Sequence, residues 1–436
     1  MYQLISINRT NKIKQYLTKP VVSWAFYDWA NSAFAVVVLT AFYPVLFASF
    51  WSTGVDPTVT TARIGAANSI SSIVIVLLAP ILGAIADANQ AKKRFLISFA
   101  IIGIVMTGCL FFIGEGQWLY ASICFVLASI GFMGANVFYD SLIVSVTQKD
   151  KYDGVSAIGF AFGYLGGGLL FLITVIMSQS PESFGFATQR EAIQFSFIAV
   201  SLWWFVFTLP IMLFVHEPSV DNNAGNLSIM AGIKQLKQTV AEIRSLKVVF
   251  LFLIAYWLYI DGVDTIVRMA IPYGMSIGLD SSNLIVAILI TQFVGFPAAL
   301  LFGYFGQKWG AKPSILVAIS VYLVITVMAS TMKSVEEFYA LAISIGLVQG
   351  GVQSLSRSFY ARIIPHTKSA EFFGFYNMLG KFAAVLGPIL MGAVGVITGD
   401  PRVSILSIAV LFVAGGVLLY FVDEQKGIQM AKELED

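Results

Sequence analysis

Charged residues are scarce in this sequence. Asp, Glu, Lys and Arg make up 11% of its 436 residues, and hydrophobic residues make up 58%. Soluble globular domains carry about 25% charged residues, so the composition excludes a soluble protein and predicts a polytopic membrane protein in a lipid bilayer. The formal net charge of +2 and the lack of a long basic run also exclude a nucleic-acid partner.

Residues that usually carry metal, redox or catalytic chemistry are equally sparse. Cys109 and Cys124 lie in different apolar runs without a CxxC spacing, so we interpret them as core thiols. His216 and His366 stand alone at the ends of apolar runs, which makes a metal site improbable. No HExxH, Walker or GxSxG signature occurs, so we expect neither an enzyme nor an ATP-driven pump, and no cofactor.

What the sequence has in abundance is long apolar runs. Each is near or above the ~20 residues that a membrane-spanning helix needs. The first follows several basic residues, but it is too long for the apolar part of a signal peptide and is expected to remain as a helix. Twelve runs occur, at residues 21–50, 63–86, 95–114, 118–147, 154–178, 192–215, 248–277, 282–305, 314–332, 335–362, 371–398 and 403–423.

Basic residues fall mostly on one set of connections between these runs. If the N-terminus is cytoplasmic, that side holds most of the Lys and Arg residues, and the opposite side has only Arg63, Arg190, Lys333 and Arg402. Since cytoplasmic connections are enriched in Lys and Arg, both termini are predicted to be cytoplasmic.

The chain is also predicted to contain two similar halves. Gly83 and Asp87 with Lys92, Lys93 and Arg94 follow the second run, and a related glycine-rich segment at 303–312 follows the eighth. A displacement of six helices indicates duplication, which is frequent in secondary transporters. We therefore expect an all-α membrane protein with twelve transmembrane helices in two pseudo-symmetric six-helix bundles, at 1–215 and 248–436, joined by a cytoplasmic linker at 216–247.

Polar and charged residues recur on the first helix of each successive triplet. Asp28 and Asn31 lie nearly one turn apart and share a helix face. An ionised carboxylate in a bilayer costs roughly 2.5–3.5 kcal/mol on insertion scales, so it must face protein or water. The residues concerned are Asp28 and Asn31, then Asn136 and Asp140, then Asp261, Asp264 and Arg268, then Gln349, Gln353 and Arg357. They predict a central path lined by helices one, four, seven and ten.

The depth of these charges predicts two layers. Asp28 and Asp140 lie about seven residues, or roughly 10 Å, from the cytoplasmic ends of their helices. There Arg357 is expected to pair with Asp140 or Asp28 across the halves as a gate. Near the midplane, Asp261, Asp264 and Lys381 are expected to surround the substrate, with Asn31, Gln349 and Gln353 as further binding residues. The alternative is that the charges only neutralise one another and fix the packing, with Asp264 and Arg268 as an internal helix pair.

Several segments resemble a known family. The segment from Gly83 through Asp87 to Arg94 resembles the loop motif of the major facilitator superfamily, with Ala88 and Gln90 as departures and Gln307 departing in the second copy. The segments 27–34, 259–262, 349–358 and 371–374 resemble the "unknown major facilitator" branch, which includes the fungal vacuolar amino-acid effluxers. The resemblance implies the major facilitator fold, alternating access, gate roles for Asp87 and Arg94, and amino-acid export.

Together these observations predict a secondary active transporter of a small polar solute, with an amino acid as the substrate suggested by the resemblance. Asp28 and Asp140 lack basic neighbours in the sequence and are candidates for proton coupling, because removal from water favours the protonated form of a carboxylate. We expect a monomer in a bacterial cytoplasmic membrane. An uncoupled facilitator and a non-transporting membrane sensor are the alternatives.

Overall fold

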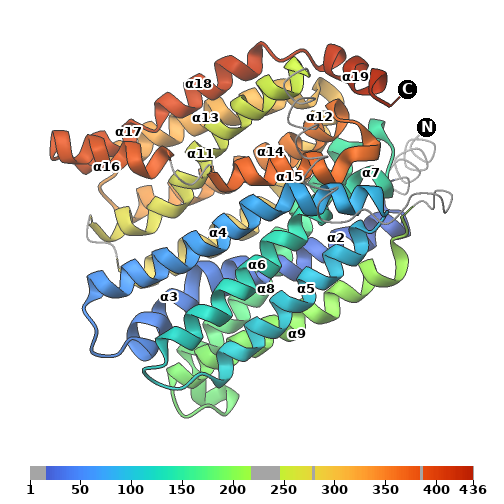
Figure 1. Cartoon of the computed structure of the whole chain (residues 1–436). Helices are drawn as coiled ribbons and strands as arrows, with labels where there is room; N and C mark the ends of the chain where they lie inside the picture. Colours follow the sequence, from blue (N-terminus) through green and yellow to red (C-terminus); the bar gives the residue numbers. More distant parts are fainter. Residues whose placement is uncertain (1–15, 218–245, 277–279, 383–385, 436) are drawn as a thin grey trace, which may run out of the picture.

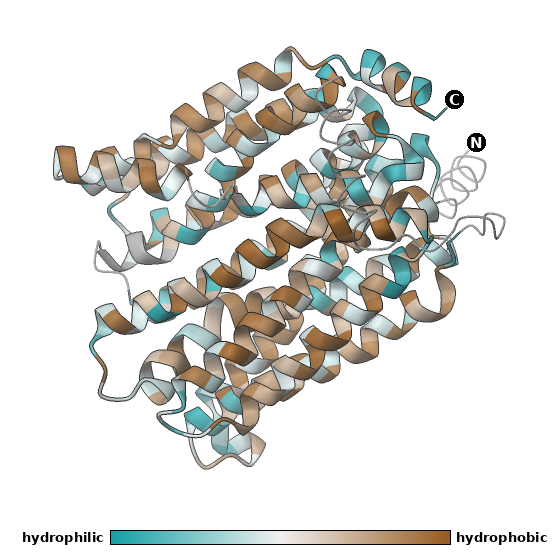
Figure 2. Ribbon diagram, in the orientation of Figure 1, coloured by the Kyte–Doolittle hydropathy of each residue, from teal (hydrophilic) through white to brown (hydrophobic). Residues whose placement is uncertain are grey.

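The computed structural model describes residues 16–217, 246–276, 280–382 and 386–435, and every regular element in these ranges is a helix. Twelve helices are long and apolar enough to cross a membrane. The predicted all-α membrane fold is therefore confirmed. Hydrophobic residues cover most of the length of these helices, and hydrophilic ones concentrate near the end where both termini lie (Figure 2).

The N-terminal half consists of six spans. The first span, Lys19–Trp51, is built from α2 (Lys19–Ala33), the π-helix η1 (Phe34–Phe42), α3 (Tyr43–Leu46) and the π-helix η2 (Phe47–Trp51). The others are α4 (Pro57–Ala88), α5 (Lys92–Cys109), α6 (Trp118–Ser141), α8 (Tyr152–Gln179) and α9 (Gln189–Phe214), and the short α7 (Ile143–Val146) follows α6.

The C-terminal half repeats this number of spans. They are α11 (Lys247–Ser276), α12 (Ser281–Trp309), α13 (Ala311–Thr331), α14 (Val335–Ile363), the pair α15 (Ser369–Phe382) and α16 (Leu386–Thr398), and α17 (Pro401–Leu406) with α18 (Ala409–Tyr420). A last helix, α19 (Glu424–Glu433), packs against α14 and α11. The expected linker at 216–247 lies almost entirely outside the described residues.

Each half is held together by its own helix contacts. In the first half α2 packs on α8 and α9, and α5 packs on α6. In the second half α11 packs on α18, and α14 packs on both α12 and α13. The halves meet where α4 packs on α15 (Figure 1), where α8 packs on α12 and α14, and where α6 packs on α15. A Cβ on Gly374 of α15 would lie 2.8 Å from the Cα of Pro80 in α4, so only glycine allows this close contact.

Two lysines make equivalent contacts in the two halves. Lys93, at the start of α5, donates from Nζ to the carbonyls of Met212 and Val215 at 2.8 Å each. Lys312, at the start of α13, donates to the carbonyls of Tyr420 at 2.6 Å and Val422 at 2.7 Å. Each lysine thus satisfies the last carbonyls of the final helix of its half, where a positive charge is favoured.

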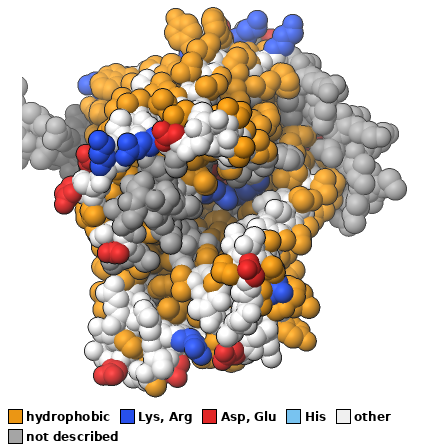
Figure 3. Space-filling model, turned by 90° about the vertical axis from the view of Figure 1, so that its left-hand side faces the viewer, with side chains coloured by type: hydrophobic (Ala, Val, Ile, Leu, Met, Phe, Trp, Pro, Cys, Tyr) orange, Lys and Arg blue, Asp and Glu red, His pale blue; other side chains and the backbone are white. Residues whose placement is uncertain are grey.

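The two halves are in contact on one side of the molecule and apart on the other. We call the side that carries Lys19 and α19 the terminus side (Figure 1). Viewed from the opposite side, the surface is hollowed between the halves, and basic side chains are visible in the hollow (Figure 3). The helices are thus arranged around a space that opens away from the termini.

Candidate functional site

A cavity of about 310 Å³ lies between the two halves, and polar side chains from both of them line it. The first half contributes Asp28, Asn31, Ser32, Asn136, Tyr139 and Asp140, and the second contributes Tyr256, Asp264, Gln353, Arg357, Asn377 and Lys381. Of the residues predicted for the substrate site and the gate, Asp28, Asn31, Asp140, Asp264, Gln353, Arg357 and Lys381 line this cavity. Tyr256, Tyr376 and Asn377 also line the cavity and were not among the predicted residues.

Arg357 forms the expected bridge between the halves. Its Nη1 lies 2.9 Å from Oδ1 of Asp140, and its side chain is only 2% exposed. The second carboxylate oxygen of Asp140 accepts a hydrogen bond from Nδ2 of Asn377 at 3.1 Å. Of the two partners that the sequence allowed, Asp140 and not Asp28 forms the ion pair, and Asp140 thereby binds two residues of the opposite half.

The other contacts of Arg357 are also with the N-terminal half. Its Nε donates to Oγ of Ser156, and its Nη2 donates to the carbonyl of Ser156, both at 2.9 Å. The guanidinium carbon lies 4.8 Å, 5.3 Å and 4.4 Å from the ring centroids of Trp24, Tyr139 and Phe160. Such cation–π contacts strengthen as water is excluded.

Asp28 is held by hydroxyl groups. Ser32 Oγ donates to Oδ1 and the Tyr139 hydroxyl donates to Oδ2, each at 3.3 Å. In the described part of the chain no Lys or Arg forms an ion pair with Asp28. Asn31, one turn further along α2, donates to Oδ1 of Asn136 at 2.5 Å. The polar stripe of the first helix therefore faces the interior, as predicted.

Asp264 and Lys381 line the cavity from the second half. Lys381 and Arg268 are the bases whose charges act on Asp264, but none of the ion pairs among the described residues includes Asp264 or Lys381. The Arg268 side chain is exposed, so the expected internal helix pair does not hold it inside the cavity.

Two residues expected at the substrate lie elsewhere. Asp261 is fully buried and accepts hydrogen bonds from the backbone N–H groups of Leu386 at 3.0 Å and Gly387 at 2.8 Å, and from the hydroxyl of Thr265 at 3.2 Å. Its carboxylate therefore binds backbone donors of α16. Gln349 lines a second, apolar cavity. Neither residue is among those lining the polar cavity.

Asp87 closes the terminus side by contacting α15. Its carboxylate accepts from the backbone N–H groups of Ala370 at 3.1 Å and Glu371 at 2.8 Å, and forms an ion pair with Nζ of Lys92 at 3.0 Å. Lys92 also donates to the hydroxyl of Ser369 at 2.5 Å. The side chain of Arg94, which was expected in the gate, is exposed, and Lys92 rather than Arg94 pairs with Asp87.

A second contact on the terminus side was missed entirely. Asp153, at the start of α8, accepts from the hydroxyl of Ser358 at 2.5 Å and forms an ion pair with Arg362 at the end of α14. Arg362 also pairs with Glu424 of α19 at 3.0 Å. Asp153 and Arg362 stand at the ends of apolar runs, where charges are normally solvated. Their shared depth on the terminus side is the only feature of the sequence that indicates a contact between them.

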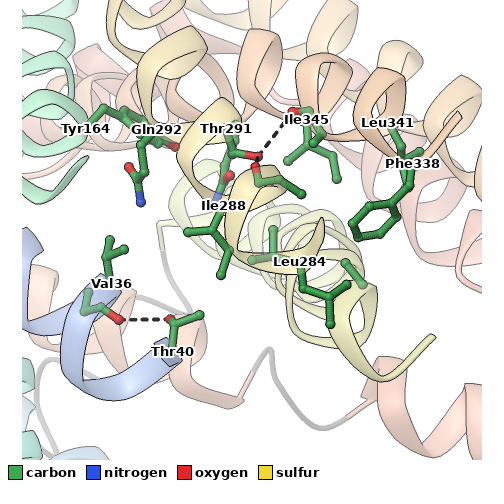
Figure 4. Close-up of a pocket in the computed structure, with 16 residues that line it drawn as sticks. Val36, Thr40, Tyr164, Leu284, Ile288, Thr291, Gln292, Phe338, Leu341 and Ile345 are labelled. Atoms are coloured by element: carbon green, nitrogen blue, oxygen red, sulfur yellow. Dashed lines mark hydrogen bonds between the residues drawn. The ribbon is translucent and has the colours of Figure 1, made fainter. Parts of the chain in front are cut away.

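The apolar cavity lies toward the open side and has a volume of about 230 Å³. Val36 and Thr40 of η1 face Leu284 and Ile288 of α12 across it (Figure 4). The Thr40 hydroxyl donates to the carbonyl of Ala35 at 2.9 Å, five residues earlier, which fits the wider turn of the π-helix. Ala35 lines both cavities, so the two spaces adjoin.

Twelve spans in two repeated halves around a polar cavity define a member of the major facilitator superfamily of membrane transporters. The proton:xylose symporter XylE has this fold, with a TM-score of 0.74, 12% identity, and coverage of 97% of this chain and 100% of that one. The chain belongs to the family described as "Vacuole effluxer Atg22 like", which matches residues 58–152 and 144–432.

Two relatives support this assignment over nearly the whole chain. The MFS-type transporter YxiO of Bacillus subtilis is 37% identical over 422 residues, covering 96% of this chain and 98% of its own. Autophagy-related protein 22 of Coccidioides immitis is 22% identical over 541 residues, covering 96% of this chain and 89% of its own. The resemblance noted in the sequence is thereby confirmed at the level of the family.

Proposed function

We propose that this member of the transporter superfamily is a secondary active transporter of a small zwitterionic solute of the amino-acid class. The observation that carries the proposal is the polar cavity between the halves, which Arg357 and Asp140 separate from the terminus side. A polar site that lies between two similar halves and is closed on one side suits alternating access.

The charges in the cavity favour a zwitterion. Lys381 can bind a carboxylate, while Asp264 can bind an ammonium group. Both residues lie in the second half, and Asn31 and Gln353 add hydrogen-bonding groups from both halves. An uncharged sugar would leave Asp264 and Lys381 with no oppositely charged group of the solute to bind, so it fits these walls less well.

The second part of the proposal is proton coupling, in which Asp28 takes up and releases the coupled proton. Among the described residues Asp28 accepts hydrogen bonds from two hydroxyl groups, and the charges of Arg357 and Asp140 both act on it. Arg357 is engaged by Asp140, so protonation of Asp28 can neutralise the remaining carboxylate when the cavity closes. The second candidate function is an uncoupled facilitator, which would use the same cavity without this step.

We further propose that the protein lies in a bacterial cytoplasmic membrane with the terminus side toward the cytoplasm. The support is the concentration of Lys and Arg on that side, together with the bacterial relative. The family is named for efflux from a vacuole. By analogy, we propose that this protein works as an exporter of its solute.

Reconstituted protein provides the test. Proteoliposomes are given a mixture of amino acids with and without an inward proton gradient, and the solutes taken up are identified by mass spectrometry. The proposal predicts accumulation of one or a few zwitterionic solutes that depends on the gradient and is strongly reduced in Lys381→Gln at solute concentrations below the KM. Equal rates with and without the gradient would favour the facilitator, and no uptake of any amino acid would refute the substrate class.

A further inference from the structure

The N-terminal half contains a complete receptor for a guanidinium group, and the C-terminal half supplies its occupant. We propose that this pocket also binds free guanidinium compounds from the terminus side whenever the halves separate there and Arg357 withdraws. The inference rests on the alternating access proposed above. It assigns a second binding function to the residues that hold Arg357 in the wall of the same polar cavity, apart from the charges of Asp264 and Lys381, for cations of this one chemical class.

Every contact that holds the guanidinium comes from the first half. Asp140 on α6 supplies the carboxylate, and Ser156 on α8 supplies two acceptors, its hydroxyl and its carbonyl. Trp24 and Tyr139 stack against each other with ring centroids 4.4 Å apart, and both lie against the cation. Withdrawal of Arg357 therefore removes none of the walls of the pocket.

The arrangement of acceptors selects a planar, forked cation. Nε, Nη1 and Nη2 of Arg357 each donate to a separate acceptor at 2.9 Å. An ammonium group is a compact point charge and cannot reach all three while lying against the aromatic rings. A Cβ on Gly159 would lie 3.0 Å from Nη2 and 2.7 Å from the Tyr139 hydroxyl, so the space is fitted to this group.

The pocket becomes accessible by the same motion that opens the gate. Ser156 Oγ donates to the carbonyl of Ser354 across the halves at 2.7 Å, so the acceptors of the pocket lie directly at the contact that must break. A guanidinium compound that enters then competes with Arg357 for Asp140 and Ser156. It holds the terminus side open and slows the return of the transporter.

The test uses methylguanidinium as the probe and methylammonium as the matched cation, each at millimolar concentration on the full chain. In Arg357→Ala the pocket has lost its occupant. Methylguanidinium is expected to raise the thermal unfolding temperature of this variant and to bind at least tenfold more tightly than methylammonium. In Arg357→Ala combined with Asp140→Asn the response should be lost. Equal responses to the two cations, or none, would overturn the inference.

A second measurement does not depend on the folding of that variant. Ser354→Cys, with Cys109→Ser and Cys124→Ser, places a thiol at the contact between the halves. Methylguanidinium should raise its rate of alkylation several-fold and methylammonium should not, whereas an unchanged rate contradicts the inference. If Arg357→Ala binds methylguanidinium but the wild type transports no amino acid, the proposed function is refuted and the guanidinium pocket is supported. If the wild type transports amino acids but methylguanidinium changes neither the unfolding temperature of Arg357→Ala nor the alkylation rate of Ser354→Cys, only the guanidinium pocket is refuted.

Discussion

Arg357 on α14 and Asp140 on α6 are separated by 217 positions in the chain, yet their side chains lie 2.9 Å apart between the two halves. Asp140 also accepts from Asn377, so one carboxylate binds two residues of the opposite half. The pair separates the polar cavity from the terminus side. Its strength therefore determines how readily that side opens.

Asp140→Asn should weaken this closure strongly. The variant leaves the guanidinium of Arg357 buried without its counter-ion, and breaking a buried pair in this way costs about 3–5 kcal/mol. Thermal unfolding in detergent should show a clear loss of stability. Glu115→Gln is the control, because its pair with Arg190 is long, at 3.8 Å, and both side chains are more than half exposed. That change should cost less than about 1 kcal/mol, and equal effects of the two variants would contradict the interpretation.

Asp28→Asn should uncouple transport from the proton gradient. The amide keeps the shape of the carboxylate but cannot take up and release a proton. We expect exchange of solute between equal concentrations to continue, while accumulation driven by a proton gradient is lost and the rate no longer depends on pH. Asp56→Asn, at the exposed start of α4, is the matched control and should behave like the wild type. Retained accumulation in Asp28→Asn would remove this residue from the coupling step.

Lys93→Gln and Lys312→Gln should destabilise the protein by similar amounts. Each removes a charged donor from two helix-terminal carbonyls, and hydrogen bonds to charged groups contribute about 1.5–3 kcal/mol. Because the sites lie in different halves, the two losses should add in the double variant. Arg94→Gln changes the neighbouring but exposed side chain and should leave the unfolding temperature unchanged. A lower unfolding temperature in Arg94→Gln would contradict this interpretation and would indicate that Arg94 contributes to the gate after all.

Asp261→Asn and Lys381→Gln should fail in different ways. In Asp261→Asn the amide nitrogen that replaces one carboxylate oxygen cannot accept from the backbone N–H group of Leu386 or Gly387. This variant should therefore lose stability and folded yield, while the surviving protein keeps its KM. Lys381→Gln should raise the KM at least tenfold and leave the unfolding temperature unchanged, because Lys381 lines the cavity. A raised KM in Asp261→Asn without loss of stability would return Asp261 to the substrate site.

The number of spans and the charged residues that line the cavity could be predicted from the sequence for one physical reason. Lipid does not tolerate isolated charges, so Asp28, Asp140, Asp264, Arg357 and Lys381 had to face the interior, and they do. Arg357 had only two acids at its own depth, which limited its choice of partner. These residues could be predicted because each had few physically acceptable positions.

The remaining placements depended on information that residue type does not contain. Asp261 could face the cavity or bind backbone donors of another helix, and it binds the N–H groups of Leu386 and Gly387 in α16, within one long apolar run. Arg94 and Lys93 are adjacent and basic, but only Lys93 points at the end of α9. Such alternatives are decided by the direction of a side chain from its helix, which becomes known only when the helices are packed.

Distances between spin labels on the two halves test the central claim most directly. On a background of Cys109→Ser and Cys124→Ser, one pair is placed at Arg94→Cys and Thr367→Cys on the terminus side, and another at Thr58→Cys and Arg402→Cys on the opposite side. When Asp140→Asn is added, the first distance should lengthen and the second should shorten, because the halves rock about the cavity. If both distances stay the same, or both lengthen together, the alternating-access account is contradicted.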